Sequence, residues 1–296
     1  MPAVIALLKE FEEERVFDYC VNNGLIGRTK TCECGGKMSI HLYNAVIDKF
    51  AYRCSSCRRR KSVRDGTFFS KSKLSLSNIL YLMYYWVMQR PVRRTAAETE
   101  NSLVSTMQWF QYCRDIAASM MNEISSSLGG EGVVVHVDEI VLDKKKSKSG
   151  RKLMVLGLYD TNLKKGLMEM VPNRSDVFLL PIIKRLVKPG SIIYTNNWSG
   201  YGQLSEMGYV HHIVEDSSGF VDPTTGKRTE SIEKLWRCLR KTIKSVRSSQ
   251  NDLLNSHLNE VMYRKWFNLS VNTPMKNWET FIQHVKECHP FENSTI

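Results

Sequence analysis

The stretch Val133-Val-Val-His-Val137-Asp138-Glu139 decides the fold of the C-terminal half of the chain. Its valine-rich run, interrupted only by His136, is typical of a buried strand, and the preceding Gly129-Gly130-Glu131-Gly132 is a strong breaker of regular structure. Further patterns follow it, with strands at 153–159, 167–171, 191–194 and 210–214 and helices at 177–186 and 201–207. Strands that alternate with helices predict an α/β array. We place a domain boundary at the glycine-rich breaker, with the α/β domain at 131–270.

Polar residues lie where two of these strands end. Asp138 ends the first strand, Asn196 ends the fourth, and Glu233 opens a long helix near residue 230. In α/β arrays the side chains that meet ligands lie at strand ends. Oxygen ligands in this order are expected for a two-metal phosphoryl-transfer site, which takes Mg²⁺ or Mn²⁺. Taken singly, each residue is more simply explained as a solvated or capping group.

Four of the eight cysteines form two pairs, Cys32-Glu-Cys34 and Cys54-Ser-Ser-Cys57, with an alternating strand pattern between them. Four soft ligands on two turns satisfy tetrahedral Zn²⁺, so this layout predicts a zinc ribbon at residues 30–69. Metal-free thiols that merely pack are the alternative. Basic side chains around the second pair would form a cationic surface suited to phosphates. They are Arg53, Arg58, Arg59, Arg60, Lys61 and Arg64.

Residues 70–130 read as all-helical. An apolar run at 74–88 is followed by a short helix at 95–100, a turn at Asn101-Ser102 and a longer helix at 103–121. This is the helix-turn-helix pattern, in which the second helix enters the major groove, although any helical hairpin looks similar. The outward residues expected on the second helix are Ser105, Gln108, Gln111 and Arg114. An amphipathic helix is expected at 3–20, within an N-terminal segment 1–29, and a tail at 271–296.

Composition limits the class of protein. A hydrophobic content of 42% favours a folded globular chain, and a net charge of +12 favours a polyanionic partner such as nucleic acid. No stretch approaches ~18 consecutive apolar residues, so no membrane partner is expected. The start lacks the order of a signal peptide. We therefore expect an intracellular protein, nuclear if the source is eukaryotic, whose cysteines bind metal or stay reduced.

Several motifs in one order give these features more weight. They are Asp138-Glu139, the Lys-x-Gly-Arg-Lys hairpin before Leu156-Gly157, Thr195-Asn196-Asn197-Trp198-Ser-Gly-Tyr201, Gly219-Phe220-Val221-Asp222-Pro-x-x-Gly226, Ile232-Glu233-x-x-Trp236 and His257-Leu258-x-Glu260-x-x-x-Arg264. Together with the cysteine segment and Val63-Arg-Asp-Gly-Thr-Phe-Phe69, the chain resembles the Merlin superfamily of cut-and-paste transposases and related bacterial insertion-sequence enzymes. The resemblance runs over residues 30–270.

The resemblance implies an RNase H-like mixed-sheet catalytic domain with an Asp-Asp-Glu metal site, preceded by the zinc ribbon and the helical region. Asp138 falls on the first acid and Glu233 on the third. Position 196 departs from the Thr-Asp-x-Trp pattern of the family, because it is an asparagine. An amide offers one neutral oxygen where a carboxylate bridges both metals, so metal binding and catalysis are expected to be weakened or lost. Asp216 is a remote candidate for a substitute carboxylate.

Cationic residues surround the expected catalytic site. Arg237, Arg240, Lys241, Lys244 and Arg247 recur at helical spacing after Glu233 and form one stripe. A solvated helix face is the usual explanation, but beside a nuclease-like site a track for the DNA backbone is favoured. Lys145 and Arg151 in the basic hairpin are further expected DNA contacts.

The sequence therefore predicts a transposase-family protein that binds double-stranded DNA at terminal inverted repeats. Zn²⁺ is expected in the ribbon, and Mg²⁺ or Mn²⁺ in a site impaired at Asn196. A homodimer is implied by the resemblance alone. Two alternatives stay open. The first is an active transposase that tolerates Asn196, and the second is a zinc-ribbon module that binds proteins and never touches DNA. Whether the gene is host-adopted or a decayed element copy also stays open.

Overall fold

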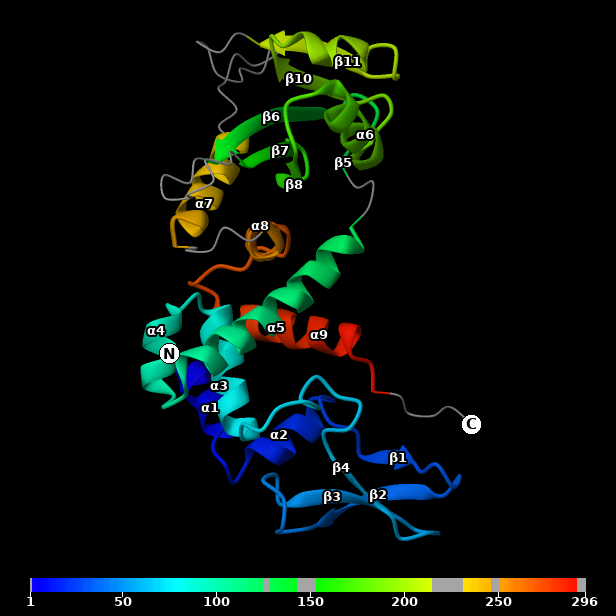
Figure 1. Ribbon diagram of the computed structural model, residues 1–296, viewed down its shortest axis with the longest axis vertical. Coiled ribbons are helices and arrows are strands. Elements are labelled where there is room, and N and C mark those ends of the chain that lie inside the picture. The colour runs from blue at the N-terminus through cyan, green and yellow to red at the C-terminus, as the bar shows by residue number, and fades with distance from the viewer. Residues whose placement is uncertain (1, 125–127, 143–152, 215–230, 246–250, 292–296) are drawn as a thin grey trace. The chain divides into compact units, whose positions relative to one another are not determined.

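The computed structural model describes residues 2–124, 128–142, 153–214, 231–245 and 251–291 (Figure 1). The chain divides into two compact units, one formed by 1–116 together with 269–296 and the other by 117–268. The expected boundary at 130/131 therefore lies inside the second unit. The physical reason is that the glycine-rich breaker contains a short strand, β5 (Leu128–Gly129), which pairs in parallel with β9 (Val187–Lys188).

The first unit contains a four-stranded antiparallel sheet that carries the cysteine pairs. Its strands β1 (Thr29–Thr31), β2 (Lys37–Leu42), β3 (Phe50–Cys54) and β4 (Arg60–Ser62) lie in sequence order. The guanidinium of Arg64 donates to both carboxylate oxygens of Asp48, at 2.5 and 2.7 Å, and also to the carbonyls of Ser72 and Leu74. Both charged side chains are about 95% buried, so this ion pair ties the β2–β3 loop to the segment before the next helix.

The helices of the first unit pack around an aromatic core. They are α1 (Pro2–Glu10), α2 (Val16–Asn22), α3 (Leu76–Val87), α4 (Val92–Glu98), α9 (Pro274–Cys288) and the part of α5 (Leu103–Asn122) up to Ile116, since its last residues belong to the second unit. The helix expected at 3–20 is two helices, because the chain turns at Phe11, whose fully buried ring packs 5.2 Å from Trp278. The segment expected as a tail contains α9, and Trp278 and Phe281 of that helix are among the largest buried side chains.

The second unit is built on a five-stranded mixed sheet. Its strands are β6 (Val134–Leu142), β7 (Leu153–Asp160), β8 (Lys165–Val171), β10 (Ile192–Asn196) and β11 (Val210–Val214), in the order β11-β10-β6-β7-β8. The first three are antiparallel, whereas β10 runs parallel to β6 and β11 runs parallel to β10. The expected mixed sheet in an α/β domain is thus confirmed. No helix in the described ranges is long and apolar enough to span a bilayer.

Four further elements accompany this sheet: α6 (Asp176–Leu186), the 3₁₀ helix η1 (Ser199–Leu204), α7 (Ser231–Ser245) and α8 (Asn251–Trp266). In Figure 1, α7 lies beside β6 and β7. A Cβ atom at Gly157 of β7 would overlap the indole of Trp236. The absence of a side chain at Gly157 therefore lets α7 approach the sheet closely, and this approach positions the residues described next.

Candidate active site and metal centre

Asp138 lies in the middle of β6 and not at its end. The strand continues to Leu142 because β6 and β7 form a long antiparallel pair, in which Asp138 lies opposite Gly157. The pairing of β6 with its parallel neighbour β10 ends earlier, and its last pair is Tyr194 of β10 with His136 of β6. Continuing that register by two residues places Asn196 next to Asp138 on the same face of the sheet. The expectation that Asp138 ends a strand is therefore wrong, although it lies at the carboxyl end of the parallel part.

Asp138 and Glu233 line one cavity of about 640 Å³. The indole Nε1 of Trp236 donates a hydrogen bond of 2.8 Å to Asp138 Oδ2 and so holds this carboxylate in place. Glu233 lies on the exposed side of α7, three residues before Trp236. The first and third expected acids are thus brought together by the packing of α7 against the sheet.

Three cations of α7 complete the cavity: Arg237, Arg240 and Lys241. All three side chains are exposed. Two acidic groups beside three basic ones suit a site where divalent cations and phosphate oxygens meet, because the carboxylates attract the metal and the cations attract the phosphate. Lys145, Arg151, Arg247, Asp216 and the side chain of Lys244 lie outside the described residues.

Asn196 is held by a different group. Arg174 Nη2 donates to Asn196 Oδ1 at 2.6 Å, and the same guanidinium lies 4.9 Å from the ring centre of Trp198. Arg174 also forms an ion pair with Glu139, which accepts a hydrogen bond of 2.7 Å from the hydroxyl of Tyr201. Asn196 is not among the described residues that line the cavity of Asp138 and Glu233.

Within the network around the exposed Arg174, the side chains of Glu139 and Tyr201 are buried and interact electrostatically. The Glu139 side chain is 4% exposed, and burial raises the pKa of its carboxyl above the ordinary value, while Tyr201 and Arg174 oppose that rise. Burial also raises the pKa of Tyr201 far above its ordinary value, with Glu139 adding to the effect. Tyr201 therefore stays protonated and donates to Glu139. The sequence motifs contain Glu139 and Tyr201, but nothing in the sequence pointed to Arg174, because its contacts come from two segments remote from it, at 139 and at 196–198.

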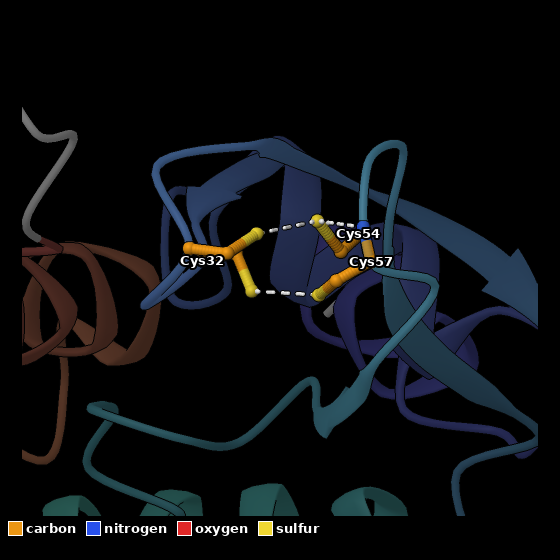
Figure 2. A group of neighbouring side chains, drawn as sticks. Cys32, Cys54 and Cys57 are labelled. Atoms are coloured by element: carbon orange, nitrogen blue, oxygen red, sulfur yellow. Dashed lines mark hydrogen bonds between the residues drawn. The ribbon is translucent and has the colours of Figure 1, made fainter.

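The four cysteines of the first unit form a compact cluster in which all sulfur atoms lie within 4.8 Å of one another. The Sγ atoms of Cys32 and Cys57 are 3.6 Å apart, and those of Cys34 and Cys54 are 3.5 Å apart. Four sulfurs at about 2.3 Å from a tetrahedral Zn²⁺ would be about 3.8 Å from one another, so the thiols fit this ion. Figure 2 shows the labelled sulfurs of Cys32, Cys54 and Cys57 converging.

The backbone supports thiolate formation in this cluster. Cys57 N–H donates to Cys54 Sγ at 3.5 Å, and this bond with one from Ser56 N–H lowers the pKa of the Cys54 thiol to about 6. A thiolate is the form that binds a metal. The donor set and its geometry therefore match those of a structural metal centre.

The basic residues near the cysteines differ in their surroundings. Arg59 and Lys61 both pair with Glu33, at 2.5 and 2.8 Å, whereas Arg58 is exposed. Arg60 stacks over the ring of Tyr43 at 4.6 Å. These positions agree with a basic surface beside the cysteine cluster.

Two arginines that the sequence assigned to the surface are buried. Arg64 is 3% exposed and is occupied by Asp48. Arg114 is 6% exposed, and its guanidinium donates to Gln111 Oε1 at 2.7 Å. The expectation that Arg114 points outward from α5 is wrong, because it falls on the buried stripe that also contains Phe110 and Cys113.

Known proteins show what this chain is similar to. Residues 127–265 match the sequence model of the ISXO2-like transposase domain of the IS1595 family. An uncharacterised transposase-like protein of Haemophilus influenzae is 26% identical over 95 residues, which are 32% of this chain and 76% of that protein.

Among solved structures, the integrase catalytic core domain of HTLV-2 in complex with magnesium, in its dimeric form, is 12% identical with a TM-score of 0.31, over 47% of this chain and 86% of that one. The simian T-cell lymphotropic virus intasome in complex with the PP2A regulatory subunit B56 gamma is 11% identical with a TM-score of 0.30, over 60% and 66%. Both TM-scores are too low to assign a fold by themselves. The domain match includes Asp138, Asn196 and Glu233, and together with the curated relative it supports an insertion-sequence transposase.

Proposed function

We propose that the chain is a transposase-family DNA-binding protein that recognises transposon ends, and that its phosphodiester cleavage and strand-transfer site is impaired at Asn196. The proposal rests on one observation: two of the three expected acid positions lie in the same cavity, and the third contacts a different group. Asp138 and Glu233 share a cavity with three cations, whereas the amide oxygen of residue 196 is engaged by Arg174. The finer likeness to Merlin elements is part of the same proposal.

The residues of the cavity have separate tasks in this proposal. Asp138 and Glu233, with residue 196, would hold Mg²⁺ or Mn²⁺, which supplies Lewis acidity and lowers the pKa of an attacking water or 3′-hydroxyl. Trp236 fixes one oxygen of Asp138 through its 2.8 Å hydrogen bond. Arg237 and Arg240 attract and orient the phosphodiester, because charge-assisted hydrogen bonds to phosphate are strong and directional.

Asn196 weakens this arrangement for two physical reasons. Its side chain carries no charge, so the site loses one of the three negative charges that balance divalent cations. Its single carbonyl oxygen already accepts a hydrogen bond of 2.6 Å from Arg174. A metal ligand at this position would have to compete with a guanidinium, which repels cations. DNA binding does not depend on this oxygen and is expected to persist.

The first unit would supply recognition of the element ends. Cys32, Cys34, Cys54 and Cys57 would bind structural Zn²⁺ and present Arg58 and Arg60 to the DNA backbone. The helices α4 and α5 would act as a helix-turn-helix. A homodimer on paired terminal repeats, and action inside the cell or in the nucleus of a eukaryote, belong to this proposal.

The test measures binding of the full chain to a labelled terminal-repeat duplex across a series of salt concentrations. Each lost phosphate contact should reduce the slope of log affinity against log salt by about 0.9. The double variant Arg237→Gln/Arg240→Gln should therefore lower the slope by about 1.8, while Arg185→Gln, which changes an arginine on α6 outside the cavity, should leave it unchanged. Binding that is absent at low salt would contradict the proposal and favour a protein-interaction module.

A further inference from the structure

The N-terminal turns of α5 carry an apolar surface that no contact in the described residues covers. The exposed fractions are 39% for Leu103, 70% for Val104 and 49% for Met107. The opposite face of the helix is fully occupied by the core, where Thr106, Trp109 and Phe110 are at most 4% exposed. The helix is therefore fixed in rotation, and it presents Val104, Met107 and Gln108 on one side.

This face of α5 lacks the charges that usually keep a solvated helix surface polar. Residues 103–113 contain no Asp, Glu, Lys or Arg. The exposed cations lie on the preceding helix α4, where Arg93 and Arg94 are on the surface and Arg94 forms an ion pair of 2.8 Å with Glu98 one turn along. In a helix-turn-helix the first helix crosses the DNA backbone and the start of the second meets the base edges. The charges of this unit follow the same division. The exposed cation Arg93 lies on α4, where phosphates would lie, and the start of α5, where bases would lie, is uncharged.

The start of α5 is also locally rigid, as a recognition surface needs to be. Ser102 Oγ accepts a hydrogen bond of 3.0 Å from the backbone N–H of Ser105 and so caps the helix. Gln108 Nε2 donates to the hydroxyl of Tyr112 at 2.7 Å, which holds the amide one turn along the helix while its oxygen stays available. Met107, whose unbranched side chain adapts readily to a partner, lies between Val104 and Gln108 in the helix.

We infer that Val104 and Met107 read thymine 5-methyl groups in the major groove and that Gln108 reads a neighbouring adenine, an inference that rests on the proposed DNA-binding function. Apolar side chains contact the thymine methyl, and glutamine pairs with the N6 and N7 edge of adenine. One helical turn advances about 5.4 Å and one base pair about 3.4 Å, so Val104 and Gln108 lie one to two base pairs apart. The recognised half-site therefore contains a short A·T-rich step.

The test uses the full chain and a duplex selected from a random pool for tight binding. Each thymine of the selected site is replaced singly by uracil, which removes only the 5-methyl group and keeps base pairing. Loss of one buried methyl at about 0.8 kcal/mol corresponds to about a fourfold loss of affinity, and this is expected at one or two adjacent A·T pairs. Val104→Ser should abolish the difference between thymine and uracil at one of them. The control is Val177→Ser on α6, a valine with 71% exposure that should preserve the difference.

The possible results separate the inference from the proposed function. A chain that binds no duplex at low salt contradicts the proposed function itself. A chain that binds a selected site with equal affinity for thymine and uracil at every position overturns the inference alone. The inference is also overturned if Val104→Ser leaves every thymine-to-uracil difference intact. A changed sedimentation coefficient in that case would show that the surface joins two copies of the chain instead.

Discussion

Replacement of Asn196 by aspartate should restore metal binding to the site between Asp138 and Glu233. The new carboxylate would take the hydrogen bond of 2.6 Å that Arg174 now donates to the amide oxygen. Hydrogen bonds to a charged acceptor contribute about 1.5–3 kcal/mol, compared with about 0.5–1.5 kcal/mol for a neutral one. Arg174 would therefore lower the pKa of the introduced acid, and Asp138 would raise it. Neither effect approaches the ~3 units needed to neutralise an aspartate at pH 7.

The expected gain in metal affinity follows from this competition. A unit charge about 4 Å from another contributes roughly 4 kcal/mol at an effective dielectric constant of about 20. The interaction with Arg174 must be given up in part, at about 1.5–3 kcal/mol. The net gain is about 1–2.5 kcal/mol, which corresponds to a roughly 5- to 70-fold increase in affinity for Mg²⁺.

Two assays measure the outcome. Titration calorimetry with Mn²⁺ or Mg²⁺ compares the affinity of Asn196→Asp with that of the native chain, and a labelled terminal-repeat duplex reports metal-dependent cleavage. Asn196→Asp should cut, and adding Asp138→Asn to it should abolish cutting. An Asn196→Asp chain that binds DNA normally but gains neither metal affinity nor cleavage would refute the reasoning. Cleavage by the native chain that is lost in Asp138→Ala would show that Asn196 is tolerated.

Three further predictions concern stability and the cysteine cluster. Cys54→Ser should remove bound zinc, measured by atomic emission against one ion per native chain, whereas Cys113→Ser, at a buried cysteine away from the cluster, should retain it. Arg64→Met leaves the buried carboxylate of Asp48 unpaired and should lower the free energy of unfolding by about 3–5 kcal/mol, whereas Arg59→Met, at an exposed pair, should leave it nearly unchanged in the same urea titration. Burial lowers the pKa of His211, so the unfolded state binds more protons than the native state just below pH 6.5, and stability should fall as the pH falls through this range. His211→Gln should reduce this loss in thermal unfolding curves, and an unchanged pH dependence would contradict the assignment.

The features predicted well from the sequence are those encoded locally. The cysteine pairs signal a metal centre through their own spacing, and the structure brings all four sulfurs together. The strand that contains Asp138 was likewise visible as an apolar run, and the helix after Glu233 was visible as cationic residues at helical spacing. What the pattern did not give is the length of β6, which depends on pairing with β7 across a hairpin.

The features that the sequence did not predict depend on tertiary contacts. Arg174 contacts Glu139 in one segment and Asn196 and Trp198 in another, and both lie more than 20 residues from it, so no local spacing indicates this role. Arg114 was assigned to the surface by its charge, but its position on the helix places it among core residues. The burial of Arg114 therefore follows from its position around the helix axis and not from its charge.

The place of α9 has a consequence for the order in which the molecule forms during synthesis. Residues 117–268 form one unit, and the core of the other needs Trp278 and Phe281 from the last helix. A ribosome therefore completes residues 117–268 first, while the core of the cysteine-bearing unit waits until Trp278 and Phe281 have been added. The two parts of the first unit must come together across residues 117–268, and the chain entropy lost in closing this loop grows only with the logarithm of its length. A nascent chain that stops before Pro274 would thus keep a foldable second unit but lack the core of the first.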